Sequence, residues 1–251
     1  MWDHYISTLG SGSDYTAFQD FAGIAFLSMG FGNTGKDAVF HYHSNYDSLD
    51  WMDKFGDPGF EHHASMAKIW GLIAANLVET PVLQLNATDY AISLHKYVES
   101  VKDKAKEAKF GSEDGTLDSL FGPLDKAVSQ LKFASKLHDS VAAYLLQKYY
   151  DDDIPWWKWW EKIKLYYAIR SVNTKYKLLE RQFLHADGLD GRAWFKHVVF
   201  APGRWTGYAG ATFPGIVEAI EDNNKAAARR WVGIVTGLVE NAASFLTPEG
   251  V

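Results

Sequence analysis

Two histidines one residue apart, His41 and His43, are the first candidates for chemistry in this chain. They lie in the segment FHYHSNYDS, residues 40–48, beside tyrosines and just ahead of several carboxylates. In an extended segment, side chains two residues apart share one face, so both imidazoles could reach one metal ion. In a loop they could point in any direction, and a histidine beside tyrosines is more often a hydrogen-bonded structural residue. The segment alone therefore leaves both roles open.

A zinc site needs three or four ligands, and few suppliers lie near these histidines. The pattern His-Glu-x-x-His, which places two ligands on one face of a helix, is absent from the sequence. Glu61, His62 and His63 are consecutive on an expected helix, so we expect their side chains to fan out around it rather than converge. The nearby suppliers are Asp47, Asp50, Asp53, Glu61, His62 and His63.

Three further segments carry residue types that can do chemistry. GSGSD, residues 10–14, could be a phosphate-binding loop or a serine nucleophile turn. It lacks the lysine that a phosphate-binding loop requires, and it also lacks the second glycine of a nucleophile turn. Ser44 beside His43 could be a nucleophile, although sequence neighbours rarely adopt that geometry. Tyr208 lies in FAPGRWTGYAGATFPG, residues 200–215. Its phenol could hold a substrate carboxylate, or it could be a buried tyrosine bonded to the backbone.

Composition narrows the function classes. The chain has 251 residues, 47% of them hydrophobic and 22% charged, with a net charge of -6. We expect no nucleic-acid partner, since phosphate binding requires a basic face. No apolar run approaches the roughly 18 residues that span a bilayer, so we expect no membrane contact by this chain. The absence of cysteine excludes disulfides, thiolate zinc ligands and thiol nucleophiles.

Aromatic residues are unusually frequent, at 15% of the chain with ten tryptophans. Four of these tryptophans lie in PWWKWW, residues 155–160. Large apolar rings gather in cores and at protein interfaces. Stacking on sugars is the alternative, which would make this segment a carbohydrate-recognition module.

Hydrophobic periodicity predicts an α/β beginning and a helical remainder. Residues 1–50 are rich in Gly, Ser, Asp and Asn, and AGIAFLSMGF, residues 22–31, predicts a buried strand because it is short, apolar and bounded by glycines. Pro81 stops a helix that ends at Glu79, and we place a domain boundary there. Residues 184–213 are irregular. The expected helices are 58–79, 87–108, 117–150, 159–183, 213–224 and 225–246.

A series of motifs then occurs in one order along nearly the whole chain. They are LGSGSDYTAF, GIA, YHSNYDS, KFGDPGFEHH, DYA, KY and FKHVVFAP followed by YAGATFPGI. With these motifs the chain resembles the C-terminal third of the glutamate carboxypeptidase II and transferrin receptor family. The most specific parts of the resemblance are YHSNYDS and YAGATFPGI.

The resemblance implies a mainly α fold: a helical bundle dimerisation domain preceded by a partial α/β segment from a zinc aminopeptidase-type domain. Residues 1–80 would be the end of the peptidase domain, and residues 81–251 the helical dimerisation domain. Family members pair as homodimers and are usually membrane-anchored, with this region lumenal or extracellular. One glycosylation sequon, Asn86 to Thr88, agrees with a secretory route.

The resemblance also assigns roles to individual residues. The family site holds two zinc ions, and His43 matches the last of five ligands; the other four lie in sequence that this chain does not contain. Tyr42 matches the tyrosine that stabilises the tetrahedral oxyanion of a peptide substrate. Gly12, Ser13 and Tyr208 match substrate-binding positions. We therefore expect the chain by itself to bind no zinc tightly and to be inactive, because one imidazole cannot hold the metal.

Several positions depart from the family pattern. FLSMGF, residues 26–31, lacks the arginine pair of glutamate-releasing members, and Ser13 replaces an asparagine. Gly207 precedes Tyr208 where the family has a lysine, so Arg204 is a candidate replacement for that cation. These departures favour a peptidase of altered specificity. The alternative is a non-catalytic, receptor-like or scaffold protein whose role is homodimerisation.

Overall fold

A computed structural model of the chain describes residues 7–32, 35–36, 39–110, 116–151, 154–205 and 207–247. These residues form two compact units. The larger unit combines the residues up to Phe26 with those from Leu85 onward, and the smaller unit runs from Leu27 to Gln84. The domain boundary expected near Pro81 stays a prediction.

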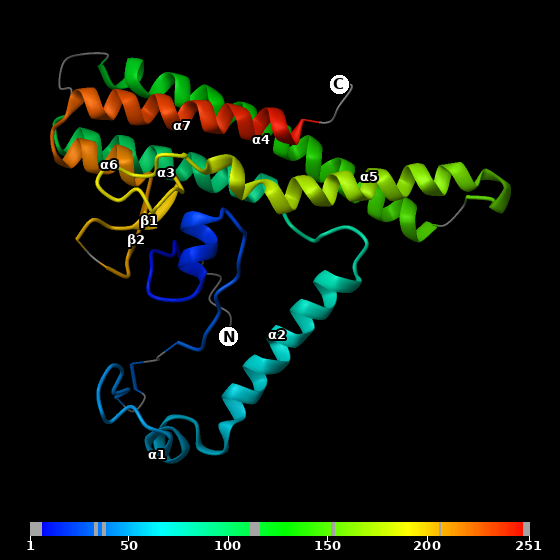
Figure 1. Cartoon of the computed structure of the whole chain (residues 1–251), viewed down its shortest axis with the longest axis horizontal. Coiled ribbons are helices and arrows are strands. Elements are labelled where there is room, and N and C mark those ends of the chain that lie inside the picture. The colour runs from blue at the N-terminus through cyan, green and yellow to red at the C-terminus, as the bar shows by residue number, and fades with distance from the viewer. Residues whose placement is uncertain are drawn as a thin grey trace. The chain divides into compact units, whose positions relative to one another are not determined.

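The larger unit is built around one long helix, α4 (Thr116–Asp151). Helix α3 (Ala87–Glu107) and helix α7 (Lys225–Leu246) both pack against it. Figure 1 shows the three helices side by side. The expectation of a mainly α fold is confirmed.

The three helices associate because each has one continuous apolar face. On α4, Leu124, Val128 and Leu131 are almost completely buried, at the spacing of three and four residues that places side chains on one side of a helix. On α3 the same spacing buries Leu94 and Val98, and α7 has an apolar face of its own. The α7 residues that fill the core are Ala228, Trp231, Val232, Val235, Val239, Ala242 and Leu246.

Pro123 lies inside α4 without ending it. Proline removes one backbone hydrogen bond and normally disturbs the helix around it. Here the loss falls early in the helix, while the buried face from Leu124 onward holds the following turns in place. The pair Gly122-Pro123 therefore does not divide the helix.

Helix α5 (Trp159–Leu178) packs against α4 and is followed by the short helix η5 (Glu180–Phe183). Asp139 of α4 joins these helices to α3. Its carboxylate accepts hydrogen bonds from the backbone N–H groups of Ala87 and Thr88 at 3.2 and 2.9 Å, and from the Tyr176 hydroxyl at 2.7 Å. One side chain therefore caps α3 and binds α5.

Helix α6 (Pro214–Glu221) lies against α7 at a point that requires glycine. A Cβ atom on Gly215 would lie 2.4 Å from the ring of Trp231. Any larger residue would push the two helices apart. The short loop Asp222 to Asn224 then leads into α7, where the Asn224 side chain accepts a hydrogen bond from Ala227 N at 3.0 Å.

Residues 184–213 are largely irregular, as predicted, but they contain a small hairpin that the sequence did not indicate. Strand β1 (Phe200–Pro202) pairs antiparallel with β2 (Gly210–Thr212). An isolated bridge between Leu9 and Ala209 adds the N-terminal segment to this hairpin. A short π-helix, η1 (Ala17–Phe21), follows in that segment.

The smaller unit contains helix α2 (Glu61–Glu79), which confirms the helix predicted to end at Glu79. None of its residues is buried in the described chain, and Leu72 and Val78 are exposed. Before it come three short elements, α1 (Leu49–Trp51), η2 (Met52–Gly56) and η3 (Pro58–Phe60).

The buried strand predicted over residues 22–31 is wrong. All ten residues are described, and they form no strand. Leu27 and Phe31 are exposed rather than buried. A strand is stable only when a neighbouring strand accepts its backbone hydrogen bonds, and the described residues provide no such neighbour here. An apolar run bounded by glycines was therefore insufficient to specify a strand.

Replacing Asp139 with alanine tests the junction of α3, α4 and α5. We expect Asp139→Ala to lower the free energy of unfolding by about 2–4 kcal/mol, because it leaves two N–H groups of α3 and the Tyr176 hydroxyl without their acceptor. Chemical denaturation measures the change. Asp103→Ala is the matched control, since Asp103 is exposed and pairs with the exposed Lys106, and we expect a change below about 0.5 kcal/mol. Equal effects of the two substitutions would contradict this role.

Candidate functional site

The structure brings together two of the three predicted substrate-binding residues. Gly12 adopts a φ of 100°, a left-handed conformation that favours glycine. The ring of Tyr208 lies directly against it, because a Cβ atom on Gly12 would be 2.1 Å from two ring carbons. The pair comes from segments almost 200 positions apart in the sequence. The Leu9–Ala209 bridge and a hydrogen bond from Ser11 Oγ to the Gly207 carbonyl oxygen at 2.6 Å hold these segments together.

Ser13, the third predicted substrate-binding residue, lies at the start of the same turn. Its carbonyl oxygen accepts hydrogen bonds from Thr16 N at 3.1 Å and Thr16 Oγ1 at 2.8 Å. The Ser13 side chain is exposed, and so is that of Tyr208. Gly12, Ser13 and Tyr208 thus share one surface region of the larger unit.

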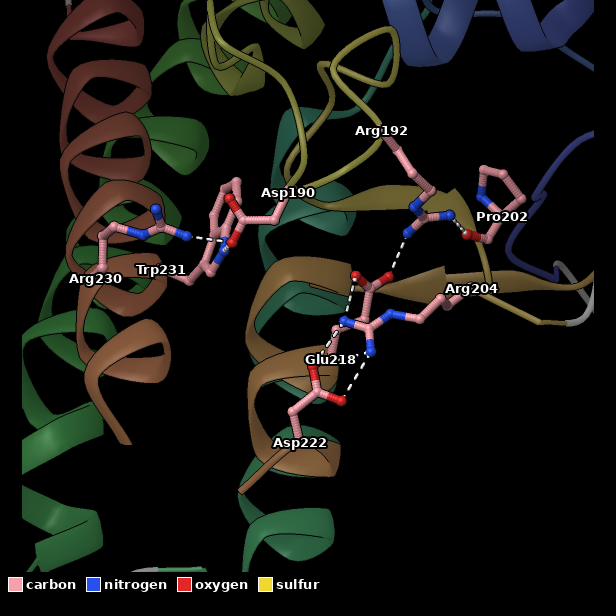
Figure 2. Close-up of polar contacts among 8 residues, drawn as sticks. All are labelled: Asp190, Arg192, Pro202, Arg204, Glu218, Asp222, Arg230 and Trp231. Atoms are coloured by element: carbon pink, nitrogen blue, oxygen red, sulfur yellow. Dashed lines mark hydrogen bonds and ion pairs between the residues drawn. The ribbon is translucent and has the colours of Figure 1, made fainter. Parts of the chain in front are cut away.

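Arg204, the candidate replacement for the family's lysine, is engaged in an internal ion-pair network. Its guanidinium donates to both oxygens of Asp222 at 2.8–3.0 Å and to Glu218 at 3.3 Å (Figure 2). The hydrogen bond to Asp222 and the neighbouring carboxylates raise the pKa of Arg204, although partial burial opposes them. To hold a substrate carboxylate, Arg204 would first have to leave two carboxylates of its own chain.

Glu218 is shared by a second arginine. Arg192 donates to Glu218 and to the carbonyl oxygen of Pro202, the latter at 2.7 Å, so it connects α6 to the end of β1 (Figure 2). Burial raises the pKa of Glu218, and the two arginines oppose this effect. Two arginines and two carboxylates give a balanced network, whose role in the structure is to hold the loop that carries Tyr208.

A second connection anchors the irregular segment to α7. The Asp190 carboxylate accepts a hydrogen bond from Trp231 Nε1 at 2.9 Å and pairs with Arg230 (Figure 2). The Trp231 side chain is buried, so its N–H group requires such a partner. The loop between η5 and β1 is thereby attached to the helical core.

His197 lies at the centre of a buried polar cluster that the sequence did not single out. Its Nδ1 atom accepts hydrogen bonds from the N–H groups of Val199 and Phe200 at 3.2 and 3.1 Å. The ring proton must therefore be on Nε2, which faces Glu180 Oε2 at 3.1 Å. The Tyr90 hydroxyl donates to the same oxygen at 2.9 Å. The fixed tautomer indicates a structural histidine that joins α3, η5 and β1.

Asp20 connects the N-terminal segment to this cluster. Its carbonyl oxygen accepts from the N–H groups of Lys196 and His197 at 2.7 and 3.0 Å. Its carboxylate is fully buried, with one oxygen bonded to Gln19 and the other without a hydrogen-bond partner among the described residues. Burial raises the pKa of Asp20 to about 6, against opposing effects of Gln19, His197 and Arg192. No motif in the sequence signals this buried acid.

Tyr42 and His43 belong to the smaller unit, where both side chains are exposed. Their rings stack with centroids 3.8 Å apart, and His43 has a left-handed φ of 59°. The segment is a series of turns, so the extended geometry that would place His41 and His43 on one face is wrong. Ser44 Oγ donates to the His41 carbonyl oxygen at 2.8 Å, which gives no support to a nucleophile activated by His43.

His62 and His63 converge, contrary to our expectation that they would fan out. Their Nδ1 atoms lie 2.7 and 2.6 Å from the two oxygens of Asp57. The same carboxylate accepts the backbone N–H groups of both histidines at 3.1 and 3.0 Å, so it caps the start of α2. Burial would raise the pKa of Asp57, but the hydrogen bonds from His63 and His62 outweigh it and lower the pKa well below its usual range. The Asp-Pro pair ahead of the helix was the available signal.

The described residues provide no cluster of three or more His, Asp, Glu or Cys side chains that could hold a metal ion. His43 is one exposed donor, and Asp57 is occupied by the two histidines of α2. The residues present therefore do not fit a complete zinc site, and we derive no catalytic step through the metal from them. Within the described part of the chain, no helix is long and apolar enough to cross a bilayer.

Comparison with known proteins agrees with this architecture. Residues 120–247, half of the chain, match the family described as "Transferrin receptor-like dimerisation domain". This match covers almost all of α4 and the whole of α5, α6 and α7, which all belong to the larger unit. The chain belongs to this family.

Relatives extend the similarity to nearly the whole chain. A "Probable glutamate carboxypeptidase" of Arthroderma benhamiae is 32% identical over 245 residues, which cover 96% of this chain and 30% of the relative. "Aminopeptidase NAALADL1" of Mus musculus is 30% identical over 257 residues, 97% of this chain and 31% of the relative. "Vacuolar protein sorting-associated protein 70" of Saccharomyces cerevisiae is 27% identical over 258 residues, which cover 98% of this chain and 31% of the relative. The resemblance is confirmed, and the chain spans about a third of the length of these relatives.

The buried carboxylate of Asp20 predicts a pH-dependent stability. Its pKa is raised from 3.8 to about 6, so the folded state holds the proton more tightly than the unfolded state does. The penalty for ionising Asp20 is absent below pH 3.8, grows as pH rises to 6, and is constant above that. We expect Asp20→Asn to increase the free energy of unfolding by at most about 3 kcal/mol at pH 7.5, and by no more than about 0.6 kcal/mol at pH 4.

Chemical denaturation at the two pH values measures the difference. Asp14→Asn is the control, because Asp14 is an exposed aspartate in the same N-terminal segment. We expect this substitution to cause the same small change in the free energy of unfolding at both pH values. A gain for Asp20→Asn that is the same at pH 4 and pH 7.5 would show that ionisation of Asp20 is not its cause.

Proposed function

We propose that this chain is the C-terminal dimerisation region of a zinc metallopeptidase that resembles glutamate carboxypeptidase, and that it forms a homodimer. The observation that carries the proposal is the family match over residues 120–247, which coincides with the packed helices of the larger unit. Relatives named as a glutamate carboxypeptidase and an aminopeptidase support a peptidase as the whole protein. Its substrate would be a peptide.

The chain contributes only part of the peptidase machinery under this proposal. His43 would be one zinc ligand, and Tyr42 would donate its phenolic hydrogen bond to the oxyanion that forms on the substrate carbonyl. Gly12, Ser13 and Tyr208 would contact the substrate. Zinc bound in the whole protein, two ions in the family pattern, would supply Lewis-acid chemistry at the substrate carbonyl. The contact between Gly12 and the Tyr208 ring supports the grouping of these substrate residues.

The exposed apolar side chains of α2 also favour a larger protein. Leu72 and Val78 are 71% and 84% exposed, and a mostly apolar helix is normally covered on at least one face. In the whole peptidase, α2 would be covered by the rest of the catalytic domain. We further propose that the parent is membrane-anchored through sequence that is not in this chain, with this region lumenal or extracellular.

A non-catalytic scaffold is the second candidate. It is favoured by the departures from the family pattern at Ser13 and Gly207, by the internal pairing of Arg204, and by a yeast relative whose name denotes protein sorting. The sequence upstream of residue 1 discriminates between the two functions. If that upstream sequence lacks the aspartate that bridges the two zinc ions in the family, and the glutamates beside it, the scaffold function would be favoured.

Experiments on the isolated chain test the proposal that it carries only part of the peptidase active site. In a calorimetric zinc titration we expect no tight stoichiometric site, because His43 alone cannot hold the ion. A dipeptide library incubated with the pure chain and zinc should remain intact. Efficient hydrolysis that co-purifies with the chain would refute the proposal, since the missing ligands would then be unnecessary.

The whole protein tests the roles of Tyr42 and His43. We expect Tyr42→Phe to lower kcat by about 10²–10³ with unchanged zinc content, because it removes one donor to the oxyanion. His43→Ala should lower the zinc content itself. Tyr46→Phe is the matched control, because Tyr46 is an exposed tyrosine in the same series of turns, and it should retain full activity. Unchanged kcat in Tyr42→Phe would remove Tyr42 from the mechanism, and a hydrolytically inactive wild-type protein with zinc present would favour the scaffold.

A further inference from the structure

The α4–α5 helical hairpin extends beyond the rest of the helical core. Helix α4 has 36 residues, whereas α3 has 21 and α7 has 22. At 1.5 Å per residue α4 is roughly 20 Å longer than either neighbour. Figure 1 shows its C-terminal end running past the end of α7 together with the first turns of α5. Helix α5 packs against α4, and it is the long helix of the larger unit drawn beside this end of α4 in Figure 1.

Helix α5 has two apolar faces in this projecting part. Ile169 and Val172 are buried and belong to the face that continues toward the core. With 100° of rotation per residue, Trp159, Ile163 and Tyr166 form a separate row, centred about 115° around the helix from the buried residues. These three side chains are 62%, 45% and 60% exposed. A surface helix normally has one apolar face and one polar face, so the second apolar face of α5 requires another explanation.

The second face continues into neighbouring rings to form a single surface. We call it the aromatic stripe and define it as Trp156, Trp159, Trp160, Ile163, Tyr166 and Tyr167. All six side chains are between 44% and 83% exposed. An aromatic side chain buries 150–250 Å² when covered, so the stripe offers roughly 700 Å². This exceeds a typical exposed apolar patch on a monomer and approaches the roughly 800 Å² that each partner contributes to a standard protein interface.

The charges around the stripe are balanced. Between residues 144 and 167 the sequence has four lysines and four acidic residues, although the whole chain has a net charge of -6. Two copies of this segment would therefore meet without net repulsion, and lysines of one copy could face carboxylates of the other. A two-fold contact of this kind places the same surface on both sides of the interface.

The residue types and ring geometry favour protein over sugar. Neighbouring indoles are nearly perpendicular, at 85° for Trp156 and Trp157 and 79° for Trp159 and Trp160. They do not form the flat platform on which a sugar ring stacks. Tryptophan and tyrosine are instead enriched at the centres of protein interfaces. The stripe also lies within residues 120–247, the region matched by the dimerisation domain family.

We propose that two copies of this chain pair through the aromatic stripe of the α4–α5 hairpin, in a two-fold arrangement with α5 facing α5. This inference rests on the proposed homodimer and assigns the surface that forms it. Pairing would cover the second apolar face of α5 and bury three of the four tryptophans of PWWKWW.

Sedimentation velocity of the full chain, over a concentration series, tests the assignment. The test variant combines Trp159→Ala, Ile163→Ala and Tyr166→Ala. Alanine is the best helix former and the three side chains are exposed, so α5 should remain folded, which circular dichroism checks. We expect the wild-type chain to be a dimer at micromolar concentration. The dissociation constant of the triple variant should rise about 100-fold or more, as for central interface residues.

Phe133→Ala is the matched control, because Phe133 is 73% exposed on α4 and is not part of the aromatic stripe. It should change the dissociation constant less than about threefold. Tryptophan emission gives a second readout: dilution of the wild type should shift the emission to longer wavelength as the stripe returns to water, and the triple variant should show no such shift.

The possible results separate this inference from the proposed function. If the triple variant remains as tight a dimer as the wild type, dimerisation stands and the assignment to the stripe is overturned; dissociation by Phe133→Ala instead would place the interface elsewhere on α4. A wild-type chain that is monomeric at all concentrations would overturn both. Co-sedimentation of that monomer with phosphatidylcholine vesicles would then assign the stripe to a lipid surface.

Discussion

The apolar face of α4 is the constraint on which the larger unit depends. Leu124, Val128 and Leu131 can leave water only if other helices cover them, and α3 and α7 do so along the first part of the helix. Burial of each such side chain contributes roughly 1.5–3 kcal/mol. Asp139 on the same helix then fixes the start of α3 and the position of α5 through its hydrogen bonds. One helix thereby sets both the core and the direction of the hairpin that projects from it.

The polar clusters place the irregular segment on this helical frame. Arg192, Arg204 and Glu218 attach the loop around Tyr208 to α6, and His197 attaches the start of β1 to α3 and η5. Because the N-terminal segment pairs with the same loop at Ala209, Gly12 and Tyr208 meet on a surface that the helices hold in place. The proposed substrate residues of the larger unit are therefore positioned by the dimerisation helices. This link gives a physical reason for the proposed substrate contacts and the dimerisation domain to share one chain.

The helices could be predicted from the sequence because their apolar residues recur every three or four positions and their ends carry recognisable signals. Asn224 before α7 and Pro81 after α2 are such signals. The strand over residues 22–31 could not be excluded in this way, because strand formation depends on a neighbour that periodicity does not reveal. The hairpin of β1 and β2 was missed because strands of three residues have no detectable alternation.

The site was only partly accessible to sequence reasoning. The family motifs drew attention to Gly12 and Tyr208, whose contact depends on a bridge between distant segments. The convergence of His62 and His63 on Asp57 depends on how the first turn of α2 is capped, and consecutive numbering suggested the opposite. The pairing of Arg204 with Asp222 requires α6 and its loop to be folded together. In each case the missing information was the position of a contacting residue that lies far away in the sequence or around a turn.

Native mass spectrometry of the isolated chain in zinc-containing buffer tests the central claim most directly, because one spectrum reports both assembly and metal content. A species with twice the mass of the chain and no stoichiometric zinc is the result that a dimerisation region lacking most of its metal ligands requires. A single chain, or a species that retains zinc in a fixed ratio after buffer exchange, would contradict the account.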